Sequence, residues 1–170
     1  MAGTTTNFSW PFPTNPDVAN VAADMQSLAA AIDATLGNAW TAYTPAWTGT
    51  GSNPVIGNGT INGRFKRLGK WGIATGMIVM GTTTTFGTGN YRFGLPPGWS
   101  FENSAPIVLC RGTGFVNDAA PVVGYPCTVQ YSSATTFAMR TNNTADLTPT
   151  VPITFTTSDV ITWEILAELQ

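Results

Sequence analysis

Histidine is absent from this chain of 170 residues, and charged side chains make up only 9% of it. Ordinary soluble proteins carry roughly 25% charged residues. Without an imidazole, a serine or cysteine nucleophile lacks its usual general base, and a zinc ion lacks its commonest nitrogen ligand. The GxSxG motif that holds the nucleophile of many hydrolases is also missing. These absences argue against nucleophilic hydrolases and zinc enzymes.

Strong net charge and long apolar runs are missing too. The formal net charge is −2, which gives no field to hold nucleic acid or an anionic membrane. Apolar runs such as Met77–Met80 are far shorter than the roughly 20 residues that cross a bilayer. The N-terminus has neither a basic patch nor an apolar segment of the kind that marks a secretory signal. We therefore expect no nucleic acid partner and no membrane insertion.

The acidic residues and cysteines offer no clear chemistry. Three acids fall in a predicted helix: Asp17, Asp24 and Asp33. Two lie four residues apart on a predicted strand, Glu164 and Glu168. The others stand where acids cap turns: Glu102, Asp118, Asp146 and Asp159. Cys110 and Cys127 are too few for a disulfide framework and too far apart in sequence for a metal site, so they are either buried free thiols or one disulfide. We expect no catalytic residue, no metal and no cofactor.

What the sequence does have is an extended N-terminal segment over residues 1–14. Pro11 and Pro13 exclude a helix there and predict an extended arm. The arm carries the aromatic side chains of Phe8, Trp10 and Phe12. Either these rings dock on a partner surface, which would make the arm an attachment element, or they pack on the chain's own stalk or a sister subunit.

A helix is predicted over residues 15–37. Asn15 followed by Pro16 is a helix-start signal, and Gly37 is a plausible C′ residue that ends the helix. Apolar residues spaced three and four apart form one stripe between these signals: Val18, Val21, Met25, Leu28 and Ile32.

The stripe is narrow enough for a coiled-coil seam, or for the inner face of a helix packed on its own domain. The other faces of the helix are small and polar, which favours the seam. A helix of about three heptads is marginal alone and needs help from another oligomeric interface. Three strands are compatible with the seam residues.

Short β runs separated by glycine, proline and asparagine fill residues 38–170. The runs are 61–68, 71–79, 91–95, 107–111, 122–125, 127–131, 136–140, 153–156 and 160–169. Gly69-Lys70 suits a two-residue hairpin turn. Trp71 and Trp163 are expected in the core. The number and spacing of the runs predict a mainly β fold, an antiparallel β-sandwich of jelly-roll type.

Two surface features are candidates for binding. The basic cluster Arg64, Lys66, Arg67 and Lys70 either contacts an anionic polymer or an acidic stalk, or is a solvated hairpin whose charges discourage edge pairing. Loop-like stretches supply an aromatic surface and amide groups of the kind that glycan sites use: Trp99, Phe101, Asn142 and Asn143. The alternative for Trp99 is a place in the core.

The order of motifs resembles the C-terminal β domains of bacteriophage fibre and minor tail proteins. The resemblance rests on the segments 43–49 (YTPAWTG), 56–70 (IGNGTINGRFKRLGK), 81–89 and 93–96. The N-terminal pattern Trp10-Pro11-Phe12-Pro13, followed by the helix with Leu28–Asp33, is similar to the start of such proteins in phages of actinobacteria. The likeness covers the chain to Pro97, and beyond it only the general β character matches.

The resemblance implies a homotrimer on the virion surface, attached through its N-terminus to other virion proteins, with a distal domain for contact with host-surface glycan. It implies either a short tail spike or minor tail protein, or a head fibre or capsid decoration protein of the same plan. The missing repetitive shaft sets the chain apart from long tail fibres. A cell-wall glycan depolymerase is a more distant alternative.

Overall fold

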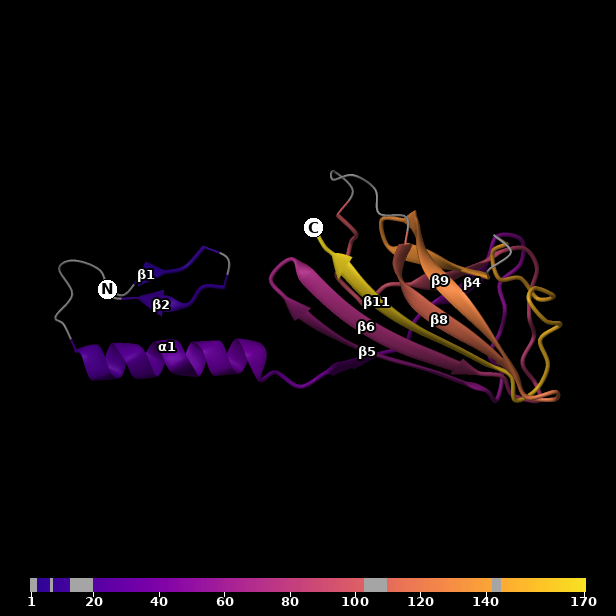
Figure 1. The fold of residues 1–170 in the computed structure, drawn as a ribbon, viewed down its shortest axis with the longest axis horizontal. Coiled ribbons are helices and arrows are strands. Elements are labelled where there is room, and N and C mark those ends of the chain that lie inside the picture. Colours follow the sequence, from indigo (N-terminus) through magenta and orange to yellow (C-terminus); the bar gives the residue numbers. More distant parts are fainter. Residues whose placement is uncertain (1–2, 7, 13–19, 103–109, 142–144) are drawn as a thin grey trace.

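The structure is a computed structural model that describes residues 3–6, 8–12, 20–102, 110–141 and 145–170. Figure 1 shows a hairpin and a helix at one end of an elongated molecule and a β domain at the other. The hairpin, helix and strands are β1 (Gly3–Thr4), β2 (Pro11–Phe12), α1 (Val21–Leu36), β3 (Thr41–Tyr43), β4 (Trp47–Gly49), β5 (Thr60–Leu68), β6 (Trp71–Val79), β7 (Tyr91–Gly94), β8 (Cys110–Asp118), β9 (Val123–Ser133), β10 (Thr136–Thr141) and β11 (Val160–Glu168). The mainly β prediction is confirmed.

The N-terminal segment is folded back on itself, so the prediction of a simple extended arm was wrong. Strands β1 and β2 pair antiparallel, with Gly3 opposite Phe12 and Thr4 opposite Pro11. Thr5 closes the turn because its carbonyl accepts from the Ser9 amide at 2.9 Å and its hydroxyl accepts from the Trp10 amide at 2.9 Å. The hairpin lies beside α1 (Figure 1).

Helix α1 begins at Val21, so the predicted start at Asn15 was wrong; Asn15 and Pro16 lie outside the described residues. Asn20 is the N-cap, and its side-chain oxygen accepts from the Ala23 amide at 3.3 Å. The predicted end at Gly37 is confirmed. Gly37 has a right-handed backbone with φ −79°, and its amide donates to the Asp33 carbonyl at 2.6 Å, so the left-handed C′ geometry is not used.

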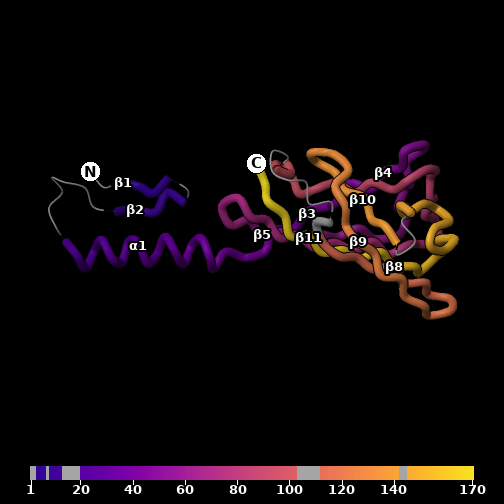
Figure 2. The backbone as a smooth tube through the Cα atoms, turned by 45° about the horizontal axis from the view of Figure 1, so that its top comes forward, coloured from indigo at the N-terminus to yellow at the C-terminus, as the bar shows by residue number. Residues whose placement is uncertain are grey.

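Within the described ranges, nine strands form one antiparallel sheet in the order β3-β5-β6-β11-β8-β9-β10-β7-β4. The two edge strands, β3 and β4, are neighbours in sequence, joined only by Thr44, Pro45 and Ala46. Nine flat strands would put the edges roughly 38 Å apart. The short connection spans at most about 14 Å. The sheet therefore curls until its edges come close, as Figure 2 shows, an arrangement compatible with a β-sandwich.

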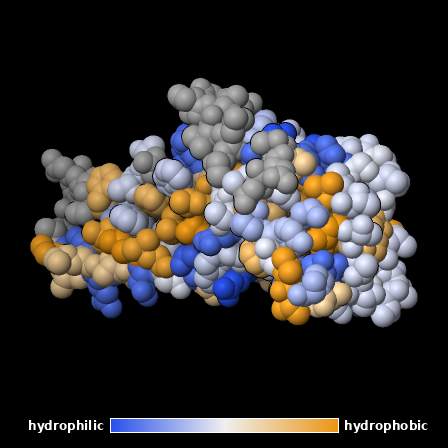
Figure 3. Space-filling view, turned by 45° about the vertical axis from the view of Figure 1, so that its right-hand side comes forward, coloured by the Kyte–Doolittle hydropathy of each residue, from blue (hydrophilic) through white to orange (hydrophobic). Residues whose placement is uncertain are grey.

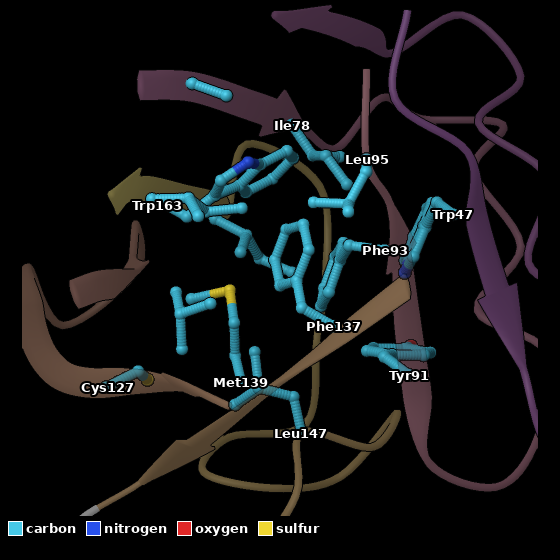
Figure 4. Packing of buried hydrophobic residues seen from close by; sticks show 14 of the residues in the cluster. Trp47, Ile78, Tyr91, Phe93, Leu95, Cys127, Phe137, Met139, Leu147 and Trp163 are labelled. Carbon is cyan, nitrogen blue, oxygen red and sulfur yellow. The ribbon is translucent and has the colours of Figure 1, made fainter. Parts of the chain in front are cut away.

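Aromatic side chains fill the space inside the curl. The Phe93 ring of β7 lies 5.3 Å from the Phe137 ring of β10 and 5.2 Å from the Trp163 ring of β11 (Figure 4). Since β7 and β11 are separated by three strands in the sheet order, this contact crosses the curl. The predicted inward face of β11 is confirmed, because Ile161, Trp163 and Ile165 are buried.

Two predictions about strands were wrong. Residues 153–156 form no strand, although Ile153 and Phe155 are buried core residues. Trp71 is 55% exposed, because β6 turns its other face, with Gly72, Ala74 and Ile78, toward the core. The runs at 122–125 and 127–131 belong to the single strand β9.

Glycines on β6 allow two indole rings to lie directly on the sheet. A Cβ atom at Gly76 would stand 2.2 Å from the Trp163 ring, and one at Gly72 would stand 2.4 Å from the Trp99 ring. No side chain fits at either position, so these glycines set the depth at which both tryptophans pack.

We predict that Gly76→Ala destabilises the fold by about 1 to 3 kcal/mol, because the methyl group must displace the Trp163 ring from a filled core. The control is Thr75→Ala on the opposite face of β6, which should change stability by less than about 0.5 kcal/mol. Urea unfolding followed by tryptophan fluorescence measures both. Equal midpoints for the two variants would contradict the prediction.

Candidate assembly and binding surfaces

The apolar stripe of α1 is largely uncovered within one chain. No residue of the helix is buried. Val21 and Met25 are 65% and 66% exposed, while Leu28 and Ile32 are half-buried. Val18, the first predicted seam residue, lies outside the described residues. Short helices derive most of their stability from packing of an apolar face, and within one chain this stripe packs only in part.

The hairpin covers one side of the helix through Trp10. The Trp10 indole N–H donates to the Thr35 hydroxyl at 3.2 Å, and the Trp10 ring stacks on Phe8 at 5.0 Å. The Phe8 ring also lies over Gly69, in the turn between β5 and β6. Trp10 thus packs on the chain's own stalk, whereas Phe8 and Phe12 stay more than a third exposed.

Trp99 and Phe101 are core residues, so their assignment to a surface binding site is corrected. Trp99 is 4% exposed and meets the Phe65 ring edge-on at 5.3 Å. Phe101 is fully buried and contacts the Tyr131 ring at 5.8 Å. Proline and glycine before Trp99 indicated a loop. The loop is present, but it directs the Trp99 side chain into the core. Asn142 and Asn143 lie outside the described residues.

The basic cluster holds parts of the chain together. The Lys66 ammonium donates to the Leu36 carbonyl at 2.5 Å, which places a positive charge at the negative end of α1. Arg67 donates to the Gly69 and Gln170 carbonyls at 2.7 and 2.8 Å. The Arg64 guanidinium lies 5.0 Å from the Trp40 ring centroid. The β5–β6 hairpin thereby connects the end of the stalk with the end of the chain.

Two acids predicted in turns are held by structural partners. Asp146 forms ion pairs with Arg92 at 2.9 Å and Arg140 at 2.6 Å. Asp159 is fully buried and accepts from the Ala119 amide at 2.9 Å and the Thr156 amide at 2.6 Å. Both carboxylates thus fix loops of the β domain.

The end of the β domain remote from α1 is made of loops (Figure 1), and the surface at that end is mostly of intermediate hydropathy (Figure 3). These loops are rich in threonine, as in the run Thr82–Thr85. Asn58 ties two of them together, because its side chain donates to the Thr82 hydroxyl at 2.9 Å and accepts from the Thr83 amide at 2.9 Å. The Thr84 hydroxyl donates to the Ile56 carbonyl at 2.6 Å. The run Thr82–Thr85 therefore lies in a loop that ends at the isolated bridge between Thr85 and Val55.

The outer face of the sheet is the feature that the sequence patterns missed. We use this name for the outward side chains of β5, β6, β11 and β8. Its exposed large apolar side chains are Trp71, Met77, Phe115 and Leu166. The sequence of β6 could have predicted this face, because the strand is apolar on both faces, and such strands are typically covered on both sides.

A hollow of about 500 Å³ lies on the outer face. Its rim includes Asn62 and Arg64 from β5, Thr75 and Met77 from β6, and Thr162 from β11. The rim is thus partly apolar and partly able to form hydrogen bonds, and it can receive a protruding side chain.

Among the residues that the structure describes, three buried polar atoms have no hydrogen-bond partner: the Tyr43 hydroxyl and the indole nitrogens of Trp47 and Trp163. The Trp163 indole lies near the Tyr43 hydroxyl without reaching hydrogen-bonding geometry. Burial dominates, and it raises the pKa of Tyr43 to about 12. The indole offsets only part of this rise.

Cys127 is a buried free thiol, which agrees with one of the two predicted alternatives. Its sulfur donates to the Tyr125 carbonyl at 3.5 Å. Burial raises its pKa to about 11. The reactive thiolate is therefore scarce at neutral pH.

We predict that Tyr43→Phe leaves stability at pH 7 within about 1 kcal/mol, because the hydroxyl that is removed has no partner. A tyrosine whose pKa is higher in the folded state keeps its proton longer when the chain is folded than when it is unfolded. Its contribution to stability is therefore complete below the unfolded pKa and is lost as pH rises to the folded pKa. For Tyr43 the window is pH 10 to 12. The variant should lose less stability than wild type across it, as measured by urea midpoints at each pH. Parallel curves would refute this.

No helix in the described parts of the chain is long and apolar enough to span a bilayer. Among the same residues, no three cysteine or acidic side chains are grouped to hold a metal ion. The chain matches no protein-family model, no curated protein and no solved structure.

Proposed function

We propose that the chain is a non-enzymatic structural protein of a bacteriophage virion, a short homotrimeric spike or minor tail protein. Its β domain attaches to the host surface, with glycan as the expected ligand class. The observation that carries the proposal is the uncovered apolar stripe of α1, with Val21 and Met25 exposed and no helix residue buried. The resemblance of the motif order to that of phage fibre and minor tail proteins supports the virion assignment.

Three helices packed along this stripe form a short stalk. With 16 residues, α1 is about 24 Å long. The stalk places the β domain, for which we keep the jelly-roll-like sandwich as the proposed arrangement, at its far end. The threonine-rich loops then stand at the tip, where hydroxyl groups can meet the hydroxyls of a glycan. The exposed Phe8 and Phe12 rings serve attachment to the particle.

A head fibre or capsid decoration protein is the second candidate, because a helix as short as α1 suits it as well as it suits a short spike. Imaging of labelled antibody on intact particles separates the two functions, because it locates the protein on the tail or on the capsid. Label on neither would refute the virion assignment.

We predict that Leu28→Asp weakens the trimer at least tenfold, because it places a carboxylate in an apolar seam. The control is Ala30→Asp, an exposed position outside the stripe on the same helix. Native mass spectrometry over a dilution series measures both. A wild-type chain that is monomeric at micromolar concentration would overturn the proposed trimer.

Deletion of residues 1–14 should abolish incorporation into particles, because it removes Phe8, Trp10 and Phe12. The seam residues from Val18 to Ile32 remain, so the shortened chain should stay a soluble trimer. Complementation of a phage that lacks the gene, followed by blotting of purified particles, provides the measurement. Normal incorporation would place the attachment point in the stalk or β domain.

A further inference from the structure

The outer face brings apolar side chains of four strands into neighbouring rows. In the sheet register, Thr162 of β11 lies between Met77 of β6 and Phe115 of β8. Leu166, four residues further along β11, lies beside Ile73 of β6. Leu166 is 55% exposed, as much as Trp71. A polar row, with Thr75 of β6 opposite Glu164 of β11, runs between these two apolar rows. Exposed apolar side chains interspersed with polar groups are typical of interfaces between proteins.

Opposite charges stand in the row between them. Arg64 of β5 lies opposite Thr75 of β6, which in turn lies opposite Glu164 of β11. Two strand spacings, roughly 10 Å, separate the two charged positions. Arg64 and Glu164 are both exposed, and the Arg64 guanidinium lies over the Trp40 ring of its own chain. The face is positive on its β5 side and negative on its β11 side, so it is complementary to another copy of itself.

The stalk alone is too short to hold three chains. Helix α1 has 16 residues, and helices of this length are marginal without further packing. A second interface between the same copies is needed, and it must belong to the β domain. Among the described residues of the β domain, the outer face carries four exposed large apolar side chains, whereas the opposite face of β6 and β11 lines the core.

We propose that the outer face binds a second copy of this chain, so that adjacent β domains in the trimer pack the β5 side of one against the β11 side of the next. The inference rests on the proposed trimer. In a closed ring of three copies, every subunit uses both sides of its face once. A protruding apolar side chain of one copy, such as Leu166, enters the hollow beside Met77 in its neighbour.

The test uses the full chain with Leu166→Glu, which puts a charge into the apolar rows. We expect the trimer dissociation constant to rise at least tenfold, measured by native mass spectrometry with α1 intact. Val55→Glu is the matched control, because Val55 is 59% exposed and lies outside the outer face. Circular dichroism of both variants checks the fold, and Leu166→Thr replaces the first variant if the fold is lost.

Reversal of charge gives a second measurement. Glu164→Arg alone should weaken the trimer, and Arg64→Glu together with Glu164→Arg should restore it, since the signs then match again across the interface. A trimer that Leu166→Glu and Glu164→Arg leave as strong as wild type overturns this inference while the stalk-based trimer stands. A monomeric wild type refutes the proposed function instead.

Discussion

The three-residue link between the edges of the sheet is the constraint on which the β domain depends. Because β3 and β4 stand at opposite ends of the strand order and yet adjoin in sequence, the other seven strands must bend into a curl between them. The curl creates an interior, and the interior requires filling. Phe93, Phe137 and Trp163 fill it from different parts of the sheet. Gly72 and Gly76 let the rings of Trp99 and Trp163 approach the backbone.

The same curl decides which surfaces remain for other molecules. With one face of β6 and β11 committed to the core, the opposite face stays outside, and its apolar side chains have no cover from the chain itself. The β5–β6 hairpin extends toward the stalk, where Lys66 and Arg67 bind the carbonyls of Leu36 and Gln170. The Lys66 bond links α1 to the β domain, and the Arg67 bond holds Gln170, just after β11, to the hairpin; hydrogen bonds from charged donors are stronger than neutral ones.

The sequence predicted features that local rules decide. The two-residue turn at Gly69-Lys70 and the inward face of β11 follow from residue type and from a period of two. Features that depend on distant partners were not predictable. Whether Trp71 or Gly72 faces the core depends on Trp99, which reaches Gly72 from a different loop.

The helix start and the ligand residues show the same limit. Asn15 and Asn20 both suit an N-cap, and local sequence does not rank them. Trp99 follows a proline-rich turn, but only the packed fold shows that the turn leads inward to Phe65. The candidate surfaces were thus partly visible as an apolar stripe on α1, whereas the outer face required the register of four strands.

The short strands at the two edges of the sheet affect how copies of the molecule behave when they are crowded together. Strands β3 and β4 have three residues each, so each offers few free backbone groups as a template for a foreign strand. The part of β5 that β3 leaves unpaired carries Lys66 and Arg67, and such charges oppose strand addition. Copies concentrated side by side, even at the local density of an ordered array, therefore have little edge through which strands of one copy could pair with strands of another.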